Sequence, residues 1–219
     1  MSTPSRPSHP HVDADPRTFW EGHYAEHRER MRGNPNALAT EHTADLTPGT
    51  ALELGCGQGA DAIRLAGAGW RVLAVDMADA ALELGRGRAA DAGVAERITW
   101  RRHDLADGVP EGSFDLVLAS YLQSPVRFAR VDVLRAAAER VAPGGTLLVI
   151  GHAGPPSWAD PGAGAHVDMP SATELVAALD LPAPEWHADV QADVQREVTD
   201  PDGQPGTRPD SVVRLRRAA

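Results

Sequence analysis

The chain contains no lysine, so its 21 basic residues are all arginines. This absence excludes a lysine Schiff base, a lysine general base and the phosphate-binding lysine of a Walker-type loop. The basic residues face 31 acidic ones, which gives a formal net charge of −10. Because such a chain is not attracted to a phosphate backbone, we expect no nucleic-acid partner.

Cysteine and long apolar runs are also scarce. Cys56 is the only cysteine, which rules out a framework of internal disulfides and a zinc site built on several cysteines. No apolar run approaches the roughly 18 residues that a membrane span needs, and the first residues lack the apolar segment of a signal peptide. We therefore expect a cytoplasmic protein with no membrane partner.

The first 50 residues change character at Pro16. Residues 1–15 are rich in Pro, Ser and His, and we expect them to form a disordered N-terminal tail. From Pro16 onward, aromatic and histidine side chains recur at helical spacing, with Asp15 placed to cap the helix. A second short helix follows Asn34-Pro35. The length of 219 residues suits one α/β domain, which we assign to residues 16–219, with 16–47 as a helical cap.

The stretch Glu53-Leu54-Gly55-Cys56-Gly57-Gln58-Gly59 joins an apolar run to an expected helix over residues 60–68. Glycine has no Cβ, so such a turn allows close approach of backbone N–H groups to a ligand. A dinucleotide-binding turn requires G-x-G-x-x-G spacing. Here the third glycine comes one residue early and an acidic residue precedes the first. The spacing disfavours a nicotinamide-dependent oxidoreductase but leaves it as an alternative.

Strands and helices alternate after this turn, which predicts a parallel sheet covered on both faces. Asp76 and Asp104 each end an expected strand, and Asp76 lies about 20 residues beyond the glycines, where a ribose-binding carboxylate belongs. As alternatives, Asp76 caps the next helix and Asp104 makes a local turn. The further expected strands are 71–76, 98–104, 114–120, 146–150, 186–198 and 211–215, and the further expected helices are 78–93, Val131 to Pro143 and 171–179. The last two strands are joined by a turn around 200–210, and residues 153–169 form a loop or lid.

In this order the motifs resemble those of the class I S-adenosylmethionine (SAM) dependent methyltransferases of the small-molecule type, close to the ubiquinone-methyltransferase and tellurite-resistance-like groups. The resemblance covers about residues 18–217. It is carried by the Glu53–Gly59 turn, Asp76, Asp104-Leu105, Phe114-Asp115-Leu116-Val117 and Pro143-Gly144-Gly145. It implies a Rossmann-like doubly wound α/β fold with seven strands, mostly parallel, the last antiparallel.

The resemblance also implies a cofactor site for SAM, with S-adenosylhomocysteine (SAH) as product. The glycine turn would hold the methionine part, Asp76 the ribose hydroxyls and Asp104 the adenine amino group, with Met77 and Leu105 packed on the ring. Trp20 and Tyr24 match a helix that closes over the cofactor. The full set of expected cofactor-binding residues is Trp20, Tyr24, Glu53, Gly55, Cys56, Gly57, Gly59, Asp76, Met77, Asp104, Leu105 and Ser120.

The implied reaction is methyl transfer to an O, N or S atom of a small molecule by in-line displacement. His152 directly follows the fifth strand and is the candidate general base, with a histidine bonded to backbone as the alternative. Tyr121, Gln123, Arg127 and Trp158 are candidates for the substrate pocket or for scaffold, and relatives often have a histidine near Gln123. No spacing indicates a metal site. A non-catalytic SAM-binding protein remains a further alternative, and we expect a monomer or homodimer.

Overall fold

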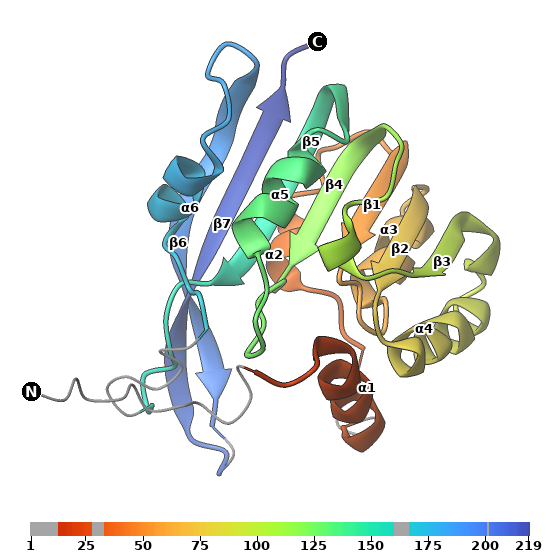
Figure 1. The fold of residues 1–219 in the computed structure, drawn as a ribbon, viewed down its shortest axis with the longest axis vertical. Helices are drawn as coiled ribbons and strands as arrows, with labels where there is room; N and C mark the ends of the chain where they lie inside the picture. The colour runs from red at the N-terminus through yellow and green to blue at the C-terminus, as the bar shows by residue number, and fades with distance from the viewer. Residues whose placement is uncertain (1–12, 28–32, 160–166, 201) are drawn as a thin grey trace, which may run out of the picture.

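A seven-stranded mixed sheet forms the centre of the protein in the computed structural model, which describes residues 13–27, 33–159, 167–200 and 202–219. The strand order is β3-β2-β1-β4-β5-β7-β6 (Figure 1). β1 to β5 run parallel, and β7 lies antiparallel between β5 and β6. The predicted fold class is therefore confirmed. The strands are β1 Thr50–Leu54, β2 Arg71–Asp76, β3 Ile98–Arg102, β4 Phe114–Ser120, β5 Val141–His152, β6 Trp186–Thr199 and β7 Pro205–Arg217.

Helices cover both faces of this sheet. α2, α3 and α4 contribute to one apolar cluster, and α5 and α6 contribute to a second cluster on the other face. α1 lies at the carboxyl ends of the strands (Figure 1). The helices are α1 Pro16–Glu26, α2 Ala37–Glu41, α3 Ala60–Gly67, α4 Asp79–Asp91, α5 Arg130–Ala138 and α6 Ala172–Leu179, with short 3₁₀ turns η1 Ala95–Arg97 and η2 Leu105–Asp107.

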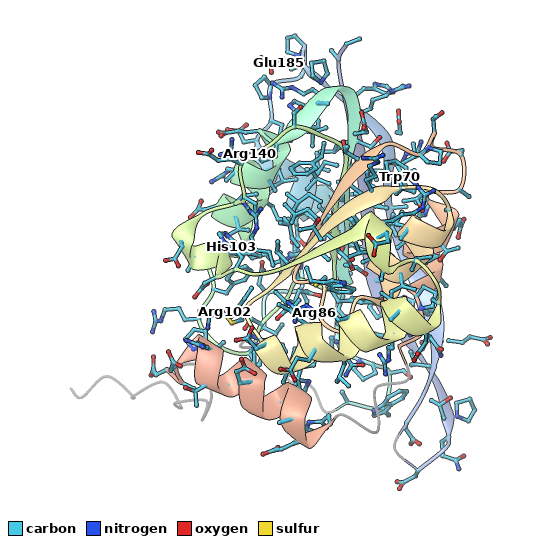
Figure 2. The ribbon with its side chains drawn as sticks, turned by 90° about the vertical axis from the view of Figure 1, so that its right-hand side faces the viewer. Trp70, Arg86, Arg102, His103, Arg140 and Glu185 are labelled. Carbon is cyan, nitrogen blue, oxygen red and sulfur yellow. The ribbon has the colours of Figure 1, made fainter. Side chains whose placement is uncertain are left out.

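The central strands are apolar because both of their faces are buried. In β4, Val117 and Ala119 pack on the α5 and α6 side, whereas Leu116 and Leu118 pack on the opposite side. Each fully buried leucine contributes about 2 kcal/mol of transfer free energy. Charged side chains such as that of Arg86 lie at the surface around this core (Figure 2). The sheet is thus a rigid base for residues at its carboxyl edge.

The boundary between α5 and β5 differs from the prediction. α5 ends at Ala138, and Val141 begins β5 instead of belonging to the helix. Pro143-Gly144-Gly145 lies inside β5, where the register with β4 jumps from Phe114–Val141 to Leu116–Thr146. Gly144 has φ +77°. The motif therefore forms a β-bulge, a device that inserts extra residues and bends a strand.

The start of β7 also corrects the prediction. The expected turn over residues 200–210 is shorter, because β7 begins at Pro205. Proline lacks an N–H but keeps its carbonyl, and the Pro209 carbonyl accepts the N–H of Ala153 at 2.9 Å. Asp210 consequently lies within a strand, paired with His152 across the sheet.

Side chains cap α1 and α6, and the α1 cap at Asp15 is the predicted one. The Asp15 carboxylate accepts the N–H of Thr18 at 2.8 Å, and Ser171 and Glu174 form a capping box at the start of α6. Most of the expected disordered tail, residues 1–12, lies outside the described residues, as do residues 160–166 of the expected lid. Among the helices that the structure describes, none combines the length and apolarity needed to cross a membrane.

Candidate active site

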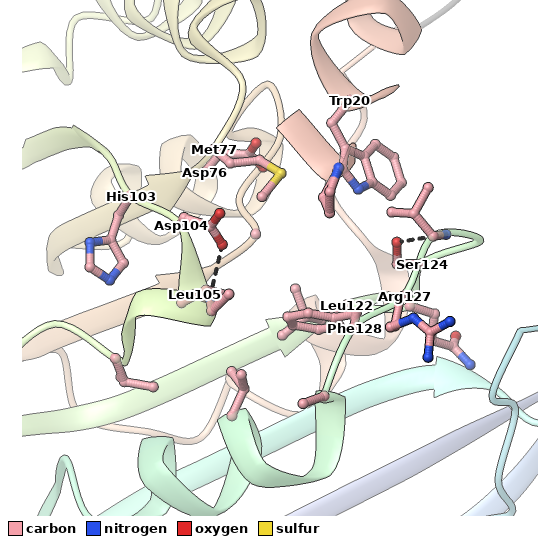
Figure 3. A pocket seen from close by; sticks show the side chains of 18 of the residues that line it. Trp20, Asp76, Met77, His103, Asp104, Leu105, Leu122, Ser124, Arg127 and Phe128 are labelled. Carbon is pink, nitrogen blue, oxygen red and sulfur yellow. Dashed lines mark hydrogen bonds between the residues drawn. The ribbon is translucent and has the colours of Figure 1, made fainter. Parts of the chain in front are cut away.

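A cavity of about 530 Å³ opens at the carboxyl ends of the parallel strands. Residues that directly follow β1, end β2, follow β3 and follow β4 all contribute to its wall, and α1 and α5 complete it. Trp20 lies across the cavity from Leu122 and Phe128 (Figure 3). Among the predicted residues that line it are Trp20, Tyr24, Gly55, Asp76, Met77, Asp104 and Leu105.

The glycine turn is shaped by three left-handed residues. Gly55, Gly57 and Gly59 have φ angles of +61°, +53° and +70°. A Cβ on Gly57 would lie 2.7 Å from the Tyr24 hydroxyl, and one on Gly59 would clash with the Trp100 ring. Only glycine therefore fits at these positions, and Gly55 presents bare backbone to the cavity.

Asp76 ends β2 and is 7% exposed. Its Oδ2 accepts the N–H of Gly57 at 2.8 Å and its Oδ1 accepts the N–H of Ala78 at 2.9 Å. The N-cap residue of α4 is Ala78, so Asp76 makes a turn just before the helix and does not cap it. An ionised carboxylate has further acceptor positions for a ligand. Burial raises the pKa of Asp76 above its ordinary value. No cationic side chain among the described residues pairs with this carboxylate, and it lines the cavity.

Glu53 lies in β1, two residues before the turn, and is 3% exposed. Burial, followed by the nearby Asp61, raises its pKa well above the ordinary value. Its Oε2 is buried and has no hydrogen-bond partner among the described residues. An unpaired buried carboxylate oxygen is costly, and an ammonium group is the partner that suits it. The bare turn at Gly55 faces the cavity and suits the amino-acid part of SAM, whereas the Glu53 oxygen lies behind the turn and does not line the cavity.

The adenine side of the predicted site is apolar apart from Asp104. Met77 and Leu105 line the cavity beside it. Asp104 Oδ1 accepts the N–H of Ala106 at 2.9 Å and so caps η2. The local-turn alternative for Asp104 is therefore present, although the residue also faces the cavity.

Helix α1 is attached to the rest of the domain through Glu21, a residue that the sequence did not single out. Its carboxylate accepts the N–H groups of Asp79 and Ala80 at 2.8 and 3.2 Å, at the start of α4. Negative charge is favourable at a helix N-terminus. This contact places Trp20 and Tyr24 over the cavity. Burial, followed by the charge of Asp76, raises the pKa of Tyr24.

Five predicted cofactor residues lie behind the cavity wall. The Ser120 hydroxyl accepts a hydrogen bond from the Asn36 side chain at 2.7 Å. Burial raises the pKa of the Cys56 thiol well above its ordinary value, so this residue packs the turn and is not an activated nucleophile. The five are Glu53, Cys56, Gly57, Gly59 and Ser120.

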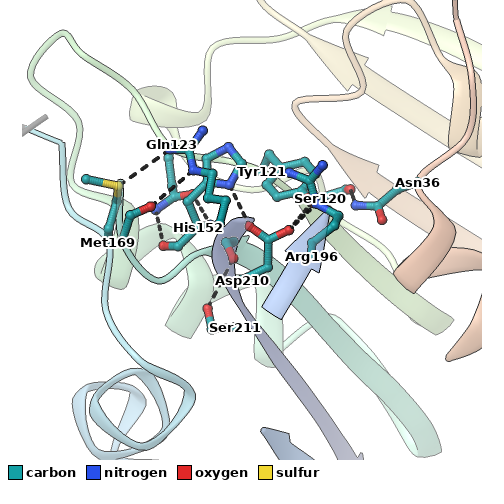
Figure 4. A network of polar contacts seen from close by, with 12 residues as sticks. Asn36, Ser120, Tyr121, Gln123, His152, Met169, Arg196, Asp210 and Ser211 are labelled. Atoms are coloured by element: carbon teal, nitrogen blue, oxygen red, sulfur yellow. Dashed lines mark hydrogen bonds and ion pairs between the residues drawn. The ribbon is translucent and has the colours of Figure 1, made fainter. Parts of the chain in front are cut away.

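Of the candidates for the substrate pocket, Tyr121, Gln123 and Arg127 line this cavity. Trp158 does not, because it packs against Gly206 in the β6–β7 hairpin. His152 also lies outside the wall, directly behind Tyr121, and its ring bonds to the carboxylate of Asp210 instead of to backbone (Figure 4).

Residues 51–145 match the family model described as a methyltransferase domain. The predicted resemblance to class I SAM-dependent methyltransferases is thereby confirmed. No curated protein matches the chain in sequence.

Solved structures share the fold of this chain across most of its length. NodS, an N-methyltransferase from Bradyrhizobium japonicum WM9 in complex with SAH, is 18% identical, with TM-score 0.63, over 92% of this chain and 98% of that one. TehB from Haemophilus influenzae is 14% identical, with TM-score 0.64, over 91% and 67%. A protein from work on the conversion of a disulfide bond into a thioacetal group during echinomycin biosynthesis is 20% identical, with TM-score 0.64, over 91% and 92%.

Sequence reasoning missed several residues in and beside the cavity. Leu122, Val126 and Phe128 form an apolar wall. Arg130 is 4% exposed, with no hydrogen bond from its guanidinium to any described residue and an ion pair to Asp168 at 3.8 Å. The sequence could have indicated that Arg130 is buried. The apolar residues of α5 recur at helical spacing, and that spacing includes position 130 and not position 131. Asp210 was hidden in the supposed turn.

Proposed function

We propose that the protein transfers the methyl group of SAM to an O, N or S atom of a small-molecule acceptor by in-line displacement. One observation carries this proposal: the left-handed glycine turn and the Asp76 carboxylate meet at a single cavity within the matched methyltransferase domain. Residues 16–219 would act as one domain, with 16–47 as its helical cap.

In this proposal each part of the wall has a separate binding role. Asp76 accepts hydrogen bonds from the ribose hydroxyls, Asp104 accepts one from the adenine amino group, and Met77 and Leu105 pack on the ring. The turn from Gly55 to Gly59, backed by Cys56 and Ser120, holds the amino-acid part near Glu53. Trp20 and Tyr24 exclude water from the other side.

SAM supplies a methyl group that is already activated on a sulfonium. The protein therefore needs only to position the acceptor, and alignment alone supplies several kcal/mol without a covalent intermediate. The apolar wall around Leu122 and Phe128 favours a small acceptor with an apolar part. The net charge of −10 supports our further proposal that the protein has no nucleic-acid partner. We also propose a cytoplasmic location and a monomer or homodimer.

Isothermal titration with SAH tests the proposed donor site. We expect micromolar-range binding to the wild type and about 100-fold weaker binding to Asp76→Ala, because hydrogen bonds to a charged group contribute about 1.5–3 kcal/mol each. Asp91→Ala is the matched control, since Asp91 is exposed at the end of α4. An absence of heat with the native protein would end the proposal. Turnover of SAM with phenols, thiols and amines then separates an enzyme from a protein that only binds SAM.

A further inference from the structure

The cavity has two chemically different ends. Figure 3 shows the carboxylates of Asp76 and Asp104 at one end and the side chains of Ser124 and Arg127 at the other. The acidic end belongs to the proposed donor site, so the end at Ser124 and Arg127 is left for the acceptor. Since the chain has no lysine, Arg127 carries the only permanent positive charge among the described residues that line the cavity.

Two other polar residues of the cavity wall, Tyr121 and Gln123, already use their hydrogen-bond donors. The hydroxyl of Tyr121 donates to Oδ2 of Asp210 at 2.7 Å. Nε2 of Gln123 donates to the carbonyls of His152 and Asp168, at 3.0 and 2.6 Å. Both side chains therefore hold the loop after β4 in place, and neither has a donor left for an acceptor molecule.

The polar groups that are still unused near Arg127 are also donors. Oγ of Ser124 accepts the N–H of Val126 at 3.2 Å, but the hydroxyl hydrogen of Ser124 has no acceptor among the described residues. Trp20 lies toward the same end of the cavity (Figure 3), and its indole N–H has no acceptor in the described part of the chain. An indole donates a hydrogen bond and does not accept one. This end of the cavity thus suits a ligand group that accepts hydrogen bonds.

The guanidinium of Arg127 is only weakly engaged. Its Nη2 donates to Oδ1 of Asp13 at 3.0 Å, in an ion pair whose two side chains are 80% and 81% exposed. Such an exposed ion pair contributes little to stability. The other N–H groups of the guanidinium have no acceptor among the described residues. Arg127 can therefore exchange Asp13 for an anionic ligand at little cost.

A carboxylate is the anion that fits this end of the cavity. Its two oxygens match the planar guanidinium in a bidentate contact. One guanidinium balances the single charge of a carboxylate, whereas a phosphate monoester carries nearly two charges. The wall beside Arg127 is apolar, because it is formed by Leu122, Val126 and Phe128. The rest of the ligand is consequently apolar.

We propose that Arg127 determines the acceptor by binding its carboxylate, and that the acceptor is a small apolar carboxylic acid. This inference rests on the proposed function and narrows its acceptor class. The carboxylate bound to Arg127 is not methylated. The O, N or S atom that takes the methyl group belongs to the part of the molecule that extends toward the donor site.

Calorimetry tests the proposal with phenylacetate, hexanoate and octanoate, each compared with its uncharged amide. Each compound is titrated at neutral pH into the protein saturated with SAH and into the ligand-free protein. We expect at least one acid to bind about fivefold more tightly than its amide, because only the acid forms an ion pair with Arg127. Equal binding of every acid and its amide, or binding by no acid, would overturn the inference.

The same titrations separate this inference from the proposed function. SAH binding without a preference for any acid would leave the donor site intact and overturn the carboxylate site alone. A preference for an acid without SAH binding would support the carboxylate site and end the proposed methyl transfer.

Arg127→Gln and Asp13→Asn form a matched pair of variants, because each removes the same ion pair and both side chains are exposed. We expect Arg127→Gln to abolish the preference for the acid. Asp13→Asn should keep it, since Asp13 competes with the ligand for the guanidinium. Arg127→Lys keeps the charge without the planar fork and should retain part of the preference. An equal loss in Arg127→Gln and Asp13→Asn would show that the ion pair only holds the chain before α1 in place, and would overturn the inference.

Discussion

Two carboxylates at the same edge of the sheet are both buried, yet they differ in their partners. Asp76 ends β2 and accepts only backbone N–H groups, and burial raises its pKa. Asp210 in β7 receives an arginine, a tyrosine and a histidine, which lower its pKa to about 2 against the effect of burial. The first carboxylate still lacks a strong partner, whereas the second is fully paired.

This difference separates a ligand site from a support. A buried carboxylate without a cationic partner is stabilised when the hydroxyl groups of a ligand donate hydrogen bonds to it, and this stabilisation contributes to the binding free energy. A carboxylate that is already paired holds the side chains around it in place and gains little from further hydrogen bonds. We therefore assign Asp76 to the donor site and Asp210 to the support of the acceptor side, and this contrast leads to three predictions.

The largest effect is expected at Asp210. Asp210→Asn changes a fully buried carboxylate that accepts hydrogen bonds from His152, Tyr121 and Arg196, and weakening three bonds of about 1 kcal/mol each should cost about 3 kcal/mol. Urea unfolding at neutral pH measures the loss in free energy of unfolding. Asp132→Asn, which removes one partner of the ion pair with Arg135 that is exposed on both sides, should cost less than about 1 kcal/mol. Equal losses in the two variants would show that Asp210 is not the better-paired carboxylate.

The second effect concerns how the free energy of unfolding of the ligand-free protein depends on pH. The pKa of folded Asp76 is raised, so above the unfolded value of 3.8 the unfolded state loses its proton first and stability falls as pH rises. Asp76→Asn lacks this loss. The free energy of unfolding of Asp76→Asn, relative to wild type, should therefore increase from pH 4 to pH 8.

The contribution of Asp210 to stability changes with pH in the opposite direction to that of Asp76. Its folded pKa of about 2 lies below the ordinary 3.8, so its contribution is present above about pH 4 and is lost as pH falls toward 2. Urea unfolding series of Asp76→Asn and wild type at each pH test the prediction. Parallel curves between pH 4 and pH 8 would show that Asp76 is not a weakly paired carboxylate.

The sequence predicted the position of Asp76 at the site but did not predict that of Asp210. Asp76 was predictable because it depends on local order: a strand, a glycine turn at a fixed distance and a following helix. Asp210 depends on contacts with His152 and Tyr121 that are far away in the chain. The preceding residue, Pro209, indicated a turn, because proline is common in turns. Its place in a strand depends on the bond that its carbonyl accepts from Ala153, which the local sequence does not show.

The same limit applies to the fold as a whole. Alternating apolar segments predicted the sheet, since periodicity follows from burial on one or two faces. The bulge at Pro143-Gly144-Gly145 was predicted as a turn, because local residue preferences do not show which strand lies beside them. The role of Glu21 was invisible for a similar reason, as its partners Asp79 and Ala80 belong to another helix.

The smallest effect is expected at Glu21, whose contact with α4 holds α1 over the donor site. Removing its carboxylate in Glu21→Ala takes away a helix cap worth about 1 kcal/mol, so α1 covers the cavity for a smaller fraction of the time. SAH affinity should fall up to about fivefold, because Trp20 and Tyr24 are carried on the same helix. Glu26→Ala, an exposed change on the last residue of α1, should leave the affinity unaltered. Equal affinities for the two variants in calorimetry would show that α1 stays in place without Glu21, and that the donor site depends on Asp76 and the glycine turn alone.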